Sequence, residues 1–149
     1  MRKTAAVSDS VLDLLAALRA IHFLHWTSHW QAKGDPSYGD HLLFQRLYEE
    51  VAGEIDGLAE KAVALGGNSA VSPTAAVGRM AEYVQTWGAS VECGADCALR
   101  AEQDLQAIVR GTYEGLKESG DLSLGMDDFL MSLANDHETH LYLLQQRLG

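Results

Sequence analysis

Apolar residues recur along this chain at intervals of three and four positions, which is the period of an amphipathic α-helix. No segment alternates apolar and polar residues as a half-buried β-strand does. The pattern predicts four long helices and one short helical piece, over about residues 8–33, 40–65, 74–87, 90–118 and 126–148. We therefore expect an all-α fold, a four-helix bundle with a short extra helix between the second and third long helices.

Capping and turn residues mark the ends of these helices. Ser8 or Ser10 can cap the first helix and Asp40 the second, because their side-chain oxygens accept hydrogen bonds from free backbone amides. The pair Gly66-Gly67 ends the second helix, and Pro73 suits the first turn of the short piece.

The size and composition of the chain describe one soluble domain. Its 149 residues match the usual size of a single domain, so we expect one domain over residues 1–149. The hydrophobic fraction of 47% excludes intrinsic disorder. No apolar run approaches the ~18 residues of a membrane span, and no apolar signal-peptide core is visible, so we expect a cytoplasmic protein.

The chain is acidic, with 11 Lys and Arg against 21 Asp and Glu and a formal net charge of −10. Such a surplus gives no general attraction to a phosphate backbone, which argues against a nucleic-acid-binding protein. The two cysteines, Cys93 and Cys97, lie four positions apart in a predicted helix, a poor geometry for a disulfide. We interpret them as small buried residues, with a thiol pair near a metal as the alternative.

Side chains that can bind metals gather at helical spacing. The histidines are His22, His25 and His29 on the first helix, His41 at the start of the second, and His137 and His140 on the fourth. Clustered imidazoles are typical of metal ligands, although core or surface histidines remain the plainer explanation for any one of them. Asp56 and Glu60 lie four positions apart, so their side chains project from the same side of the second helix. The pair is either a site that shares a cation or a solvated acidic face.

The order of these residues resembles the Dps family, the miniature ferritins of bacteria and archaea. The run 29–34 (HWQAKG) matches the family's HWxxxG, and His41 follows His29 at the family's spacing. The run 56–62 (DGLAEKA) matches its DxxAE(R/K)A segment, so the resemblance is strongest over about residues 25–67.

The resemblance implies a ferritin-like bundle that assembles into a hollow shell of twelve subunits, with a ferroxidase site at a two-fold subunit interface. His29 and His41 from one subunit, with Asp56 and Glu60 from its neighbour, would bind iron as Fe(II). Hydrogen peroxide or oxygen would oxidise it, ferric mineral would be stored in the cavity, and Trp30 would lie beside the site as an accessory residue. The alternatives are a cage that binds zinc or another divalent ion without turnover, and a helical interaction bundle without metal.

Two features of the sequence depart from the family pattern. Many members have an acid four residues after the second histidine, where this chain has Gln45, so the second iron position is in question and His25 is a candidate to help. Members that bind DNA usually use a Lys/Arg-rich extension, of which Arg2 and Lys3 are a thin version.

The helical stripes also predict a second metal site, inside the bundle. The apolar stripes of the first and fourth helices continue into His22, His25, His137 and His140, and Glu54 and Glu102 lie on or near the inward stripes of the other two helices. Larger ferritins hold a di-iron centre in this place, whereas typical Dps bundles are apolar there. The alternative is a set of buried histidines bonded to nearby carboxylates such as Asp136 or Glu138.

Overall fold

The computed structural model describes residues 7–149, so Arg2 and Lys3 lie outside the described residues. Its helices are α1 (Asp9–Gln31), α2 (Ser37–Gly66), the 3-10 turn η1 (Asn68–Val71), α3 (Pro73–Thr86), α4 (Gly94–Ser119) and α5 (Leu124–Leu148). The expected all-α bundle with a short helix in its middle connection is confirmed. Over residues 7–149, no helix is long and apolar enough to cross a membrane.

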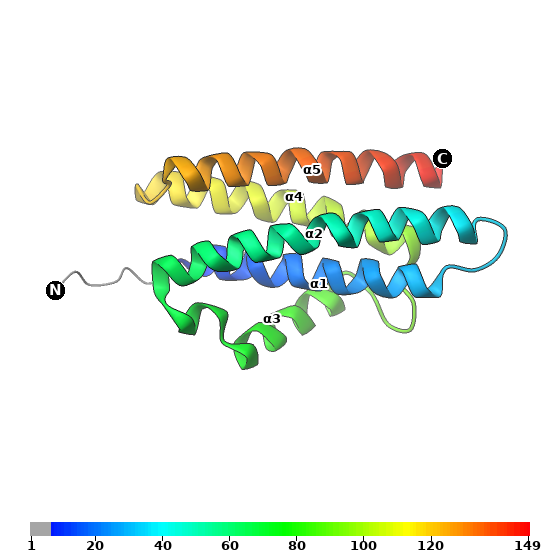
Figure 1. The fold of residues 1–149 in the computed structure, drawn as a ribbon, viewed down its shortest axis with the longest axis horizontal. Helices are drawn as coiled ribbons and strands as arrows, with labels where there is room; N and C mark the ends of the chain where they lie inside the picture. Colours follow the sequence, from blue (N-terminus) through cyan, green and yellow to red (C-terminus); the bar gives the residue numbers. More distant parts are fainter. Residues whose placement is uncertain (1–6) are drawn as a thin grey trace.

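The four long helices form two antiparallel pairs, α1 with α2 and α4 with α5 (Figure 1). Helices α1 and α5 run in one direction and α2 and α4 in the other, an order that a long middle connection permits. That connection carries α3, which lies obliquely along α1 (Figure 1). The arrangement places one face of each long helix against the interior of the bundle.

The start of each helix follows from the local sequence, with one correction. The side chain of Ser8 accepts a hydrogen bond from the Val11 amide at 3.4 Å and so caps α1. The prediction that Asp40 caps α2 is wrong, because the helix already begins at Ser37, after Pro36. Asp40 instead accepts a hydrogen bond from Arg147 at 2.9 Å, which ties the first turn of α2 to the last turn of α5.

The two cysteines form a disulfide, so the expectation of reduced, buried cysteines is wrong. The third long helix begins at Gly94 and not at residue 90, which leaves Cys93 at the N-cap. Gly94 has a φ of 69°, a left-handed conformation that glycine adopts readily and that takes Cys93 off the regular helical path. The Cα atoms of Cys93 and Cys97 are therefore only 5.0 Å apart, within the range that a disulfide bridges.

The interior of the bundle contains two apolar clusters. The larger one includes Leu14, Leu18 and Ile21 of α1, and the smaller one consists of Phe44, Leu47, Ala98 and Leu144. On α5 the buried residues His137 and His140 lie between Leu133 of the larger cluster and Leu144 of the smaller one, and Glu102 of α4 and His25 of α1 are buried as well. A buried polar layer therefore interrupts the apolar core, and the fold places it where all four long helices meet.

Candidate metal centres

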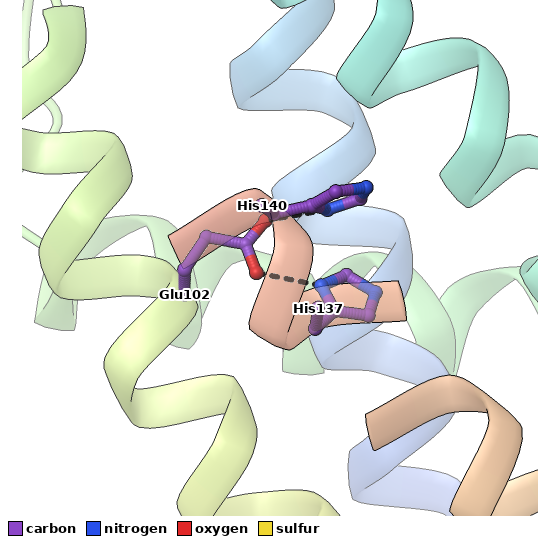
Figure 2. Close-up of side chains that lie close together, drawn as sticks. All are labelled: Glu102, His137 and His140. Carbon is purple, nitrogen blue, oxygen red and sulfur yellow. Dashed lines mark hydrogen bonds and ion pairs between the residues drawn. The ribbon is translucent and has the colours of Figure 1, made fainter. Parts of the chain in front are cut away.

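Glu102 of α4 is the centre of the buried polar layer, where its two carboxylate oxygens contact three histidines. Its Oε1 lies 2.9 Å from His25 Nε2 and 3.2 Å from His140 Nδ1. Its Oε2 lies 2.6 Å from His137 Nδ1, and the pair of α5 histidines faces Glu102 directly (Figure 2). One carboxylate on α4 thus joins α1 to two successive turns of α5.

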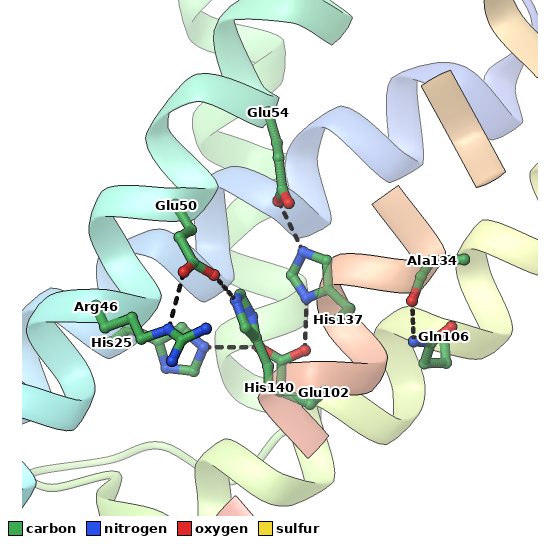
Figure 3. Close-up of polar contacts among 9 residues, drawn as sticks. All are labelled: His25, Arg46, Glu50, Glu54, Glu102, Gln106, Ala134, His137 and His140. Atoms are coloured by element: carbon green, nitrogen blue, oxygen red, sulfur yellow. Dashed lines mark hydrogen bonds and ion pairs between the residues drawn. The ribbon is translucent and has the colours of Figure 1, made fainter. Parts of the chain in front are cut away.

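Two further carboxylates, both on α2, complete the network. Glu54 Oε2 lies 2.7 Å from His137 Nε2, and Glu50 Oε2 lies 2.6 Å from His140 Nε2 (Figure 3). An ionised carboxylate only accepts hydrogen bonds, so both nitrogens of each α5 histidine donate in this arrangement. The carboxylates raise the pKa values of His137 and His140, which favours imidazolium cations at both positions.

The network shifts the pKa values of its members in opposite directions. Burial lowers the pKa of His137, but the charges and hydrogen bonds of Glu102 and Glu54 outweigh it and raise the pKa to about 10. Burial raises the pKa of Glu102, but the three histidines outweigh it and hold the pKa well below its usual range. For His25 burial dominates over Glu102, so its pKa is lowered and the ring is neutral at pH 7.

Three members of the network have the geometry of a metal site. Glu102, His137 and His140 are buried, and each offers one donor atom within 4.8 Å of the others. Imidazole nitrogen and carboxylate oxygen are donors that divalent transition metals accept. The predicted intrabundle residues His25, Glu54, Glu102, His137 and His140 are thus brought together in the structure.

His22 does not belong to this network. Its ring is half-buried and lies edge-on to Trp26 and Tyr48, at centroid distances of 5.6 and 6.0 Å. Conversely, sequence reasoning missed Glu50, which holds the outer nitrogen of His140. Glu50 lies one helical turn before Glu54 and so on the same face of α2, which is the feature of the sequence that could have indicated it.

His29 and His41 form a second, separate pair where α1 ends and α2 begins. His29 Nδ1 donates to the backbone carbonyl of His41 at 2.8 Å, and His41 Nδ1 donates to the carbonyl of His29 at 3.0 Å. Their rings are stacked, with centroids 3.6 Å apart. Because each Nδ1 carries the hydrogen, each Nε2 keeps a free lone pair, the usual arrangement of a metal-binding histidine.

Asp56 and Glu60 lie far from this histidine pair within one chain. Both are exposed on α2, and Asp56 follows His41 by about four helical turns, roughly 22 Å along the axis at 1.5 Å per residue. One copy of the chain therefore brings His29 and His41 together but does not bring the acids to them.

The surroundings of the histidine pair are aromatic and open. Trp30 is 64% exposed and lies 5.2 Å from Trp26 between ring centroids. Gln45, one turn after His41, donates to the side chain of Glu49 at 2.9 Å. His25 is buried in the bundle and bonded to Glu102, so the suggestion that it helps the His29 site is wrong.

The chain is similar to ferritin-like proteins along most of its length. A family model described as "Ferritin-like domain" matches residues 11–149. General stress protein 20U of Bacillus subtilis is 30% identical over 128 residues, which cover 81% of this chain and 82% of that protein. DNA protection during starvation protein 2 of Bacillus anthracis is 29% identical over 130 residues, with 81% and 82% covered. The solved tetragonal form of Mycobacterium smegmatis Dps shares the fold with a TM-score of 0.79 at 23% identity, covering 95% of this chain and 84% of that one.

Proposed function

The chain belongs to the Dps family of the ferritin-like superfamily, and from this we propose that it oxidises Fe(II) and stores the ferric product in a cage of identical subunits. Each subunit is one ferritin-like domain over residues 1–149, and twelve copies form the shell. The ferroxidase site lies between two subunits, with His29 and His41 from one and Asp56 and Glu60 from the other. Iron is the substrate and the cargo of this protein.

The observation that carries the proposal is the reciprocal hydrogen bonding of His29 and His41. Backbone carbonyls hold both Nδ1 hydrogens, so the two Nε2 lone pairs are free to bind an ion. A histidine pair that only filled space in the protein would not need both rings fixed in the same tautomer. The arrangement supports a pre-organised half-site that lacks only its acidic ligands.

The surface around the half-site supports a second copy as the source of those ligands. Phe23 and Trp26 of α1 are exposed, although their side chains are large and apolar. Further along the α1–α2 face lies an open, mostly apolar pocket of about 510 Å³, whose lining includes Leu15, Ile55, Val63 and Glu60. Exposed apolar area of this kind marks an interface. A two-fold axis through this face would pair each histidine half-site with the acids of the other copy.

The residues of the shared site suit the oxidation of iron. The imidazoles bind Fe(II), and the carboxylates of Asp56 and Glu60 stabilise the harder Fe(III) that forms. Two Fe(II) ions lose one electron each, and one molecule of hydrogen peroxide takes up both electrons and two protons to become two molecules of water. Trp30, which is exposed and directly follows His29, would intercept radicals that escape this reaction. The acidic surplus of the chain attracts iron cations to the cage.

The test compares Fe(II) oxidation by hydrogen peroxide in three proteins, followed by the absorbance of the ferric product. The wild type and Glu118→Gln, which neutralises an exposed acid near the end of α4, should oxidise Fe(II) at the same rate and retain the iron. The double variant Asp56→Asn, Glu60→Gln should be slower by about tenfold or more, because it has lost both hard ligands. A wild-type rate no faster than Fe(II) in buffer would overturn the proposal and leave a metal-binding cage without turnover.

A further inference from the structure

We propose that each subunit also binds one divalent transition-metal ion inside its own helical bundle, at Glu102, His137 and His140, with Glu54 as a further ligand. This site is separate from the one shared between subunits, because it uses neither His29 nor His41 and needs no second copy of the chain. It goes beyond the proposed function, and either one can exist without the other.

The donor atoms are already close to the positions that an ion requires. Glu102, His137 and His140 each offer one atom within 4.8 Å of the others. Two atoms bound to the same ion at about 2.1 Å lie at most about 4.2 Å apart. Side-chain shifts of about 0.5 Å therefore bring the three donors to bonding distance, and the ion replaces one ring proton of each histidine, so binding releases these protons. All three side chains are carried by helices (Figure 2).

Glu54 provides the second, independent observation. Its Oε2 contacts His137, but its Oε1 is buried and has no hydrogen-bond partner among residues 7–149. A buried acceptor without a partner costs about 1–3 kcal/mol, and a cation at the cluster would satisfy it. The unpartnered oxygen lies on the side chain that reaches the cluster from α2, opposite Glu102 of α4 (Figure 3).

His25 supports this site as a positioning residue. Its neutral ring donates an Nε2 hydrogen to Glu102 Oε1 at 2.9 Å. A hydrogen bond of this kind fixes the orientation of a carboxylate and makes it a better-defined ligand. The layer thus has an inner set of ligands and an outer residue that orients one of them.

Stability alone does not explain this polar layer. Replacing a buried ion network by apolar residues of similar volume is often neutral or stabilising, and the residues on either side of the layer are apolar. Five buried or partly buried ionisable residues, contributed by all four long helices, are a costly way to fill a bundle. Binding of a cation gives them a function that packing does not.

A polar pocket adjoins the cluster through Glu50. It has a volume of about 270 Å³, lies between α2 and α5, and is lined by Arg46, Glu50, Asp136 and Thr139. Glu50 lines this pocket and also contacts His140 Nε2 at 2.6 Å, so one side chain belongs to both the pocket and the network around the cluster. The carboxylates of Glu50 and Asp136 in its lining attract cations, and Arg46 is the one cationic side chain among the four lining residues.

The donor set selects the class of ion. Two imidazoles with carboxylates suit Fe(II), Mn(II), Co(II) and Zn(II), whereas Ca(II) and Mg(II) prefer oxygen ligands alone. Cu(I) prefers sulfur ligands, and the two cysteines of the chain are joined to each other at the start of α4.

The test uses Co(II) as the probe, added to metal-free protein, with anomalous maps of the crystals and metal counting in solution. We expect a Co(II) position bounded by Glu102, His137 and His140 in the wild type. This position should persist in the interface variant Asp56→Asn, Glu60→Gln, and it should disappear in Glu102→Gln. Circular dichroism reports whether the Glu102→Gln protein is folded. If it is not folded, the test uses Glu54→Gln, at the edge of the layer, which should weaken Co(II) binding at least tenfold.

The result that overturns the proposal is equally direct. A wild-type map with no Co(II) inside the bundle overturns it, whether or not the site between subunits is filled. Co(II) that stays in place in a folded Glu102→Gln protein, with unchanged binding in Glu54→Gln, also overturns it. A wild-type map with Co(II) inside the bundle but none at the interface would count against the proposed ferroxidase site and leave the intrabundle site standing.

Discussion

His29 and His41 each donate the Nδ1 hydrogen to the backbone carbonyl of the other, at 2.8 and 3.0 Å. The two residues are twelve positions apart, on different helices, and the turn between α1 and α2 brings them together. The exchange of hydrogen bonds fixes both rings before any ion or partner arrives. It makes the end of this helical pair a half-site with two nitrogen donors.

The first prediction concerns this half-site. His29→Gln should lower the initial rate of Fe(II) oxidation by about tenfold or more, because one nitrogen donor and the ring that stacks on His41 are lost together. His22→Gln is the matched control, since His22 lies on the same helix but outside both metal centres, and it should keep the wild-type rate. A full rate in His29→Gln would remove this residue from the site.

The second prediction concerns the free energy of unfolding of the metal-free protein. Glu102→Gln keeps the shape of the side chain but removes the charge that faces three buried histidines, so it should cost about 3 kcal/mol. The control Glu92→Gln breaks an exposed pair with Lys33 and should change stability by less than about 1 kcal/mol. Denaturant unfolding measures both, and equal midpoints for the two variants would contradict the central role of Glu102.

The third prediction is a pH dependence. The folded protein holds the His137 proton with a pKa of about 10, against an ordinary value of 6.5. The contribution of protonated His137 to the free energy of unfolding is therefore fully present below pH 6.5 and is lost as the pH rises towards 10. The free energy of unfolding of the metal-free wild type should fall more steeply over this range than that of His137→Gln. Parallel curves for the two proteins would show that His137 is not held as an imidazolium.

The fourth prediction follows from charge. With a net charge of −10 on each chain, the purified protein should not shift duplex DNA on a gel at moderate salt. A salt-sensitive shift would mean that a local basic surface outweighs the overall acidity.

The sequence was sufficient to predict the features that depend on spacing. Helical periodicity predicted the five α-helices, and the stripe that continues from Leu133 to His137 and His140 predicted that these histidines point inward. Both predictions depend on the fixed rotation per residue of an α-helix, which does not change with context. The resemblance to the Dps family also rests on spacing, namely that of the histidines and acids within residues 25–67.

Features that depend on tertiary contacts or on one backbone angle could not be predicted. The disulfide needed the left-handed Gly94, which moves the start of α4 past Cys93. Glu50 was missed because its side chain is 39% exposed, and only its contact with His140 makes it part of the network. Asp40 was predicted as a cap, but Arg147 at the other end of the chain binds it instead.

The central claim is that the ferroxidase site is shared between two subunits, and mixing of two inactive variants tests it most directly. One variant carries His29→Gln and His41→Gln, and the other carries Asp56→Asn and Glu60→Gln. In a mixed pair, one of the two interface sites combines the intact histidines of one chain with the intact acids of the other. Random assembly should therefore restore about a quarter of the wild-type sites, measured as the rate of Fe(II) oxidation. A mixture that stays as inactive as its two components, although mixed assemblies have formed, would contradict the account.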